Sequence, residues 1–179
     1  MDERHERVKP LIRTRQHRVF TEQPVASADL AALTDVARWT GSSRNNQPWR
    51  FIVVRDVELL RRIGDLGHPQ TRSLHSAMAA VAIAMPDDDG RPVSHAYDEG
   101  RAAERMLIAA SLLGIGAGIA WIVPDIRPAV GEALGVPADH YVRTIVAVGH
   151  PSPDGRAARS VPGTARLPRD QVVMQDQWR

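Results

Sequence analysis

The chain has 179 residues, 43% of them hydrophobic, and its 23 lysines and arginines face 21 aspartates and glutamates. This size predicts one domain with one substantial core. The absence of cysteine excludes disulfides, thiol catalysis and cysteine-based metal sites. The sequence pI is about 9.6. The net charge of only +2 and the aromatic content of 4% nevertheless disfavour a nucleic-acid binder.

No segment has the pattern of a signal peptide, and no apolar run approaches the roughly 20 residues that cross a bilayer. We therefore expect a cytoplasmic protein with no membrane partner. The acidic turn at residues 87–90 lacks a further carboxylate at calcium-loop spacing, and the seven histidines include no pair four residues apart. No metal site is expected.

The first chemically informative segment is basic. Arginines at positions 13, 15 and 18 lie within six residues, just after a short apolar turn with Leu11 and Ile12. Guanidinium groups stay charged and present forked donors that match phosphate oxygens. A solvated basic face would have the same composition. A helix should follow, capped by Ser27 and closed by Gly41, with apolar residues at helical spacing between them.

Residues 41–49 read Gly-Ser-Ser-Arg-Asn-Asn-Gln-Pro-Trp and pass directly into an apolar strand at 51–54. Such a loop concentrates hydrogen-bonding side chains at a strand edge, where a planar polar ligand could be held. Ser and Asn are also ordinary turn formers. The composition of the loop therefore permits a ligand site without requiring one.

The remaining elements alternate between helix and strand. In chain order we first expect a short helix after Asp56, another that begins at Pro69, a strand at 80–85 and a loop at 86–93. A long central helix should run from near Asp98 to Gly114. A strand at 116–122, a helix at 126–134 before Gly135, and a strand at 141–148 should follow it. Residues 151–162 should form a flexible connection to a tail. The tail's Val172, Val173 and Trp178 favour packing on the body or on a partner.

The Ser-x-x-Asn-x-Gln-Pro-Trp order at residues 42–49 resembles the flavin-binding loop of the FMN-dependent nitroreductase family. The resemblance implies an α+β fold with a central, mainly antiparallel sheet flanked by helices. It also implies an intertwined homodimer in which this loop closes over FMN bound mainly by the other subunit. The chain would then be a single domain over 1–179, with its C-terminal extension at 151–179 exchanged onto the partner. Gly41 stands where the family usually has proline.

The family opens with an Arg-Arg-Ser-x-Arg-x-Phe pattern whose basic residues bind the FMN phosphate and ribityl chain. When the two patterns are matched on Phe20, Arg15 and Arg18 occupy two of the arginine positions. Thr14 and Gln16 replace the first arginine and the serine, and both keep hydrogen-bonding capacity.

Three further places carry over from the resemblance. Arg166 matches a C-terminal basic residue that reaches the phosphate, and Arg72 lies where some members hold a lysine near flavin N1. Each could instead be a surface arginine. The main chain of Ile119, Ala120 and Trp121 would pass the flavin's reactive edge, where an amide can donate toward N5. The implied cofactor-binding residues are Arg15, Gln16, Arg18, Ser42, Ser43, Asn45, Gln47, Arg72, Ile119, Ala120, Trp121 and Arg166.

The resemblance implies an FMN-dependent oxidoreductase that oxidises NADH or NADPH and reduces nitroaromatics or quinones by ping-pong hydride transfer. No side chain is expected to act as a catalytic acid or base, because the cofactor carries the chemistry. One alternative is a non-catalytic flavin-binding or storage protein of the same fold. Another is a specialised member such as a flavin-fragmenting dimethylbenzimidazole synthase or an azoline oxidase. A nucleic-acid-binding protein is the alternative outside this fold, and salt-sensitive binding to duplex would identify it.

Overall fold

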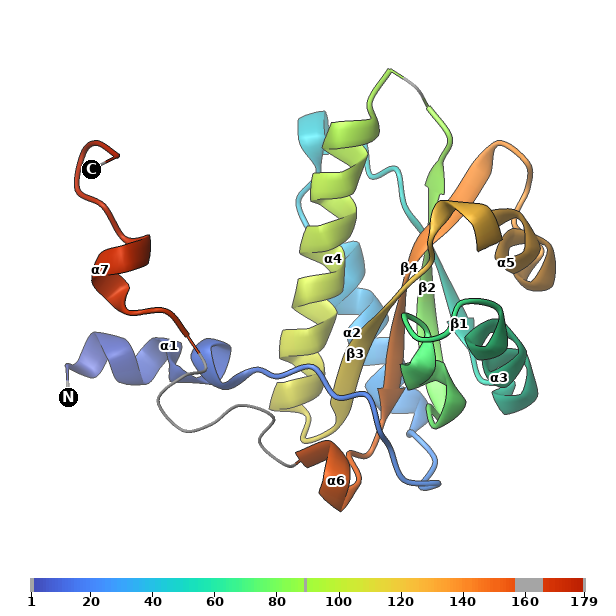
Figure 1. Cartoon of the computed structure of the whole chain (residues 1–179), viewed down its shortest axis with the longest axis horizontal. Coiled ribbons are helices and arrows are strands. Elements are labelled where there is room, and N and C mark those ends of the chain that lie inside the picture. The colour runs from blue at the N-terminus through green and yellow to red at the C-terminus, as the bar shows by residue number, and fades with distance from the viewer. Residues whose placement is uncertain (1, 89, 157–165, 179) are drawn as a thin grey trace.

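The computed structural model describes residues 2–88, 90–156 and 166–178 (Figure 1). Four strands form one sheet in the order β1-β2-β4-β3, and every neighbouring pair is antiparallel. The strands are β1 (Arg50–Val54), β2 (Ala79–Pro86), β3 (Gly116–Trp121) and β4 (His140–Gly149). The expected α+β fold with an antiparallel sheet flanked by helices is confirmed. Strands β1 and β3 form its two edges.

Helices cover both faces of the sheet. On one face lie α2 (Ser27–Arg38) and the long α4 (Pro92–Leu112), and on the other lie α3 (Val57–Leu66) and α5 (Arg127–Leu134) (Figure 1). The remaining helices are the short η1 (Ser43–Asn45), η2 (Arg72–His75), η3 (Pro124–Ile126) and α6 (Pro153–Arg156), and the peripheral α1 (Glu3–Arg13) and α7 (Arg169–Val172). In the described part of the chain, no helix combines the length and hydropathy needed to cross a bilayer.

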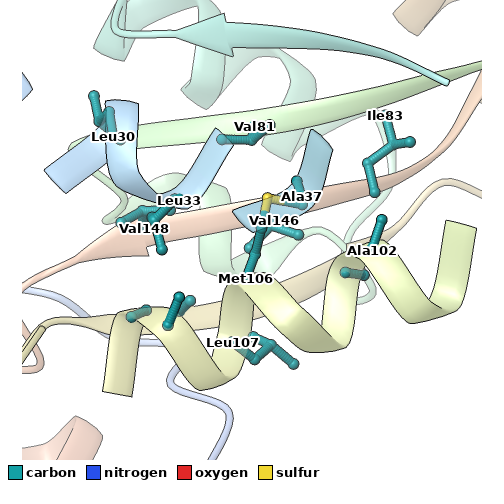
Figure 2. Close-up of a cluster of buried hydrophobic side chains, with 14 of the residues drawn as sticks. Leu30, Leu33, Ala37, Val81, Ile83, Ala102, Met106, Leu107, Val146 and Val148 are labelled. Atoms are coloured by element: carbon teal, nitrogen blue, oxygen red, sulfur yellow. The ribbon is translucent and has the colours of Figure 1, made fainter. Parts of the chain in front are cut away.

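Strand β2 is central and buried on both faces. Its odd-numbered residues, among them Val81 and Ile83, pack with Leu33 of α2 and Met106 of α4 (Figure 2). Its even-numbered residues are alanines at 80, 82 and 84, which face the core under α3 and α5. Burial on both faces explains why this strand is a continuous apolar run instead of an alternating one.

Several expected helix boundaries were wrong. Ala26 occupies the N-cap position of α2, and Ser27 is the first helical residue, where its hydroxyl accepts a hydrogen bond from Arg55. Pro69 does not start a helix, because only the 3-10 turn η2 forms, three residues later. Helix α4 begins at Pro92, six residues before Asp98, because proline fits the first turn of a helix, where its missing N–H is not needed.

The two ends of the chain lie apart from the sheet layers in Figure 1. Leu11 and Ile12 belong to α1 and not to a turn, and their side chains are exposed. Within the expected flexible connection, residues 153–156 form a helical turn, while 157–162 lie outside the described residues. Trp178 is 90% exposed, so the tail's aromatic side chain is not covered by its own chain.

Candidate functional site

The basic N-terminal segment is fixed along the outer edge of β3. Gln16 forms a parallel bridge with Ala117, and the His17 amide donates to the Ala117 carbonyl at 2.8 Å. Farther along, the Phe20 amide donates to the Ser76 hydroxyl at 3.1 Å, and the Phe20 ring is buried. These contacts fix the backbone that carries Arg15 and Arg18 against the sheet.

Gly118 allows this close approach. A Cβ atom built at Gly118 would lie 2.0 Å from the His17 carbonyl oxygen. The small residues at 116–118 thus admit the chain's own N-terminal backbone beside β3.

The backbone amides of the three predicted β3 residues, Ile119, Ala120 and Trp121, face in different directions. The Ile119 amide donates to Gln16 Oε1 at 3.2 Å, and this oxygen also accepts from Arg18 at 3.3 Å. The Ile122 amide donates to β4, so by alternation the Ala120 amide faces β4 and the Trp121 amide faces the open edge. The Ala120 side chain is fully buried. Ile119 and Trp121 are therefore the strand residues that can face a ligand.

A cavity of about 380 Å³ opens beside this segment. Among its lining residues, five were predicted from sequence, and Pro69 and Gln70 were not; the five are Gln16, Arg18, Arg72, Ile119 and Trp121. Arg72 is placed by η2, whose preceding Thr71 is buried and donates from its hydroxyl to the Gly64 carbonyl at 2.6 Å. Three distant stretches of sequence thus converge at the cavity.

The side chains of this cavity suit a ligand with an anionic group and a flat ring. Arg18 and Arg72 supply two guanidinium groups that match phosphate, and Gln16 supplies an amide. Ile119 and the half-exposed Trp121 supply an apolar wall. The volume lies near the lower end of the roughly 300 to 1,000 Å³ typical of ligand sites. One chain alone thus encloses only part of such a ligand.

Two predicted arginines do not line this cavity. Arg15 is exposed on the same N-terminal segment, one residue before Gln16. Arg166 is exposed and precedes α7.

The Ser/Asn/Gln loop lies at the opposite edge of the sheet, immediately before β1. Three strand spacings separate β1 from β3, a distance of about 14 Å. The structure therefore does not bring the four predicted loop residues to the cavity of their own chain; they are Ser42, Ser43, Asn45 and Gln47.

The loop backbone is unusual. Arg44, Asn45 and Gln47 have positive φ angles of 52°, 56° and 48°. Each such residue costs on the order of 1 to 3 kcal/mol, and such strain clusters at functional sites. The Ser42 hydroxyl accepts from the Gln47 amide at 2.9 Å and thereby closes the loop. The loop is thus a built structure held by specific contacts.

Sequence reasoning missed a second cavity of about 500 Å³ between α5 and the start of β4. There the Arg127 guanidinium lies 5.1 Å above the Tyr141 ring. Burial raises the pKa of the Tyr141 phenol above its ordinary value. At the cavity's edge, a hydrogen bond from His140 lowers the pKa of Asp139. No sequence motif marks this cavity, because its walls come from separate elements.

The antiparallel sheet between helical layers matches the fold of solved nitroreductase structures. A solved FMN-dependent nitroreductase from Clostridium difficile superposes with a TM-score of 0.82 at 21% identity, over 96% of this chain and 99% of that one. A structure from Parabacteroides distasonis titled "Putative NADH dehydrogenase/NAD(P)H nitroreductase" gives a TM-score of 0.81 at 22% identity, over 97% of this chain and 99% of that one. At these identities the likeness shows the fold alone.

Sequence comparison identifies the family. Residues 11–84 match the model of the Nitroreductase family. The chain is 30% identical over 151 residues to a protein of Archaeoglobus fulgidus named "Putative NADH dehydrogenase/NAD(P)H nitroreductase", covering 80% of this chain and 84% of the relative. A relative with the same name from Methanothermobacter thermautotrophicus is 25% identical over 171 residues, covering 93% of this chain and 85% of the relative. The chain belongs to the nitroreductase family, and this membership supports an oxidoreductase.

Proposed function

We propose that the chain is an FMN-dependent NAD(P)H oxidoreductase that reduces small aromatic acceptors such as nitroaromatics or quinones. One observation carries the proposal: Gln16, Arg18 and Arg72 converge in one cavity beside Ile119 and Trp121. When bound, FMN supplies the redox chemistry by taking a hydride from NADH or NADPH and passing it to the acceptor. The protein binds, orients and tunes the cofactor, and no catalytic side chain is assigned.

In this proposal Arg18 and Gln16 hold the phosphate and ribityl end of FMN, and Ile119 and Trp121 form the wall beside its ring. Arg15 and Arg166 are exposed and do not line the cavity of their own chain; in the proposed assembly their guanidinium groups add positive charge for the phosphate. The dense hydrogen bonding of the N-terminal segment supports this assignment, because a fixed backbone holds its arginines close to the required geometry.

We further propose a homodimer in which the loop at 42–47 of one subunit closes the cavity of the other. The chain would be a single domain over 1–179, with the extension at 151–179 packing on the partner. Two observations support the dimer. The loop and the cavity lie at opposite sheet edges, and Val93 and Tyr97 on α4 are 68% and 72% exposed. Exposed apolar faces of this kind mark interaction surfaces.

Light scattering should give the mass of two chains, whereas a stable monomer that binds FMN would contradict the dimer.

Steady-state turnover tests the reductase assignment. With FMN bound and oxygen excluded, we expect oxidation of NADH or NADPH that depends on an added quinone or nitroaromatic acceptor. Tight FMN binding without turnover by either donor would contradict the reductase and favour the flavin-storage alternative.

Arg72→Ala should lower the reduction potential of bound FMN by about 20 to 40 mV and slow its reduction. A positive charge near the ring stabilises the negative charge gained on reduction, and about 30 mV corresponds to 1.4 kcal/mol for two electrons. In Arg72→Lys the reduction potential of bound FMN should stay close to the wild-type value, because lysine keeps the positive charge. Titration against a reference dye measures the reduction potential. The control is Arg61→Ala, which removes a surface ion pair on α3. An unchanged potential in Arg72→Ala would remove Arg72 from the site.

A further inference from the structure

We propose that Asp98, on α4, is the positioning residue that fixes the strained loop at 42–47 in the conformation that contacts the flavin. Its role in ordering the loop stands on the geometry alone. Its effect on cofactor affinity rests on the proposed function.

Asp98 is buried and directed at the loop. Only 3% of its surface is exposed, and both carboxylate oxygens accept from the Ser43 amide, at 3.1 and 3.0 Å. Arg101 also pairs with the carboxylate, and its guanidinium lies 3.6 Å away on a side chain that is about half exposed. A buried carboxylate needs compensating partners. Here the loop backbone is one of them, so the loop and the charge stabilise each other.

The loop needs such an anchor because its backbone is strained. Positive φ angles at Arg44, Asn45 and Gln47 persist only where surrounding contacts enforce them. At the far end, the Trp49 side chain is buried in the core, 5.9 Å from the Phe51 ring. At the near end, the anchor to the protein body is the bond from the Ser43 amide to Asp98. The strained residues thus lie between two fixed points.

Gly41 extends this arrangement. A Cβ atom at Gly41 would lie 2.9 Å from Nη2 of Arg101, the counter-ion of Asp98. Glycine therefore leaves room for the guanidinium beside the loop entrance. The Nη2 nitrogen is the far end of a flexible, half-exposed side chain, so a small shift of Arg101 would accommodate a Cβ atom at position 41.

An ordered loop lowers the entropic cost of closing over a ligand. Removing the charge of Asp98 should therefore loosen the loop before any cofactor is present and weaken cofactor binding afterwards. Hydrogen bonds to charged groups are stronger than those between neutral groups. We therefore expect changes of roughly tenfold in the exchange rate of the loop amides and in the affinity for FMN.

The test compares Asp98→Asn with Glu99→Gln. Glu99 is the next residue of α4 and is equally buried, but it pairs with Arg143 of β4 and not with the loop. Amide hydrogen exchange on the FMN-free protein should show residues 42–47 exchanging roughly tenfold faster in Asp98→Asn and unchanged in Glu99→Gln. Fluorescence titration should show FMN affinity roughly tenfold weaker in Asp98→Asn alone. Thermal unfolding verifies that both variants fold.

If Asp98→Asn fails to fold, Ser43→Pro removes the same hydrogen bond from the loop side. Ser42 already has the extended backbone, φ −127° and ψ 161°, that precedes proline readily. Unchanged loop exchange in the folded variant would overturn the positioning role. Faster exchange with unchanged FMN affinity would overturn the link to the cofactor. A wild-type chain that binds no FMN would instead refute the proposed function, while loop exchange still decides the role of Asp98.

Discussion

Gly118→Ala should displace the N-terminal segment from β3 and weaken FMN binding at least tenfold. The added methyl group would lie 2.0 Å from the His17 carbonyl oxygen. That oxygen belongs to the backbone, so no side-chain rotation relieves the clash, and the segment that carries Gln16 and Arg18 must move. Overpacking of this kind costs about 1 to 3 kcal/mol of stability. The loss of affinity follows because the cavity loses the alignment of two lining residues.

Urea unfolding and FMN titration of Gly118→Ala check this result. Gly131→Ala in α5 is the matched control, because its added Cβ would lie at an ordinary 3.9 Å from the Val136 side chain. Alanine is favoured over glycine inside a helix by about 0.5 to 1 kcal/mol, so this control should be neutral or slightly stabilised. Wild-type affinity in Gly118→Ala would show that the N-terminal segment does not shape the site.

Arg18→Ala should weaken FMN binding by roughly 30- to 100-fold. A hydrogen bond to a charged group contributes about 1.5 to 3 kcal/mol, and an arginine fork can make two such bonds to one phosphate. Arg18→Lys should give an intermediate affinity, because lysine keeps the charge but loses the planar fork.

Riboflavin provides the sharpest control for Arg18, because it has the same ring system and no phosphate. Its affinity should be nearly equal in wild type and Arg18→Ala. A parallel loss for FMN and riboflavin would contradict a phosphate-binding role and indicate that the substitution disturbs the ring site. Arg61→Ala, in a surface ion pair with Glu58, should change neither affinity.

The sequence predicted the elements well where the signal was local. Strand β2 is an apolar run and α2 has apolar residues at helical spacing, so each was predicted to within a few residues. The order of strands in the sheet depends on contacts between distant residues and was not predicted, because the family resemblance implied only a mainly antiparallel sheet. The start of α4 was misplaced because the first turn, from Pro92, has exposed residues and little apolar periodicity.

The candidate site was predictable as a set of residues but not as a geometry. The arginine cluster and Arg72 were chosen through the resemblance, and the structure brings Arg18 and Arg72 to one cavity. The roles of Gly118 and Asp98 depend on the backbone atoms of His17 and Ser43, which are distant from them in sequence. No local pattern encodes contacts of that range.

The visible absorption spectrum of the purified protein tests the central claim most directly. After addition of FMN and removal of free flavin, we expect the flavin bands to remain with the protein. Under anaerobic conditions they should then bleach on addition of NADH or NADPH, and the donor that bleaches them faster is the preferred one. A folded protein that retains no FMN would contradict the assignment of the β3-edge cavity as a flavin site.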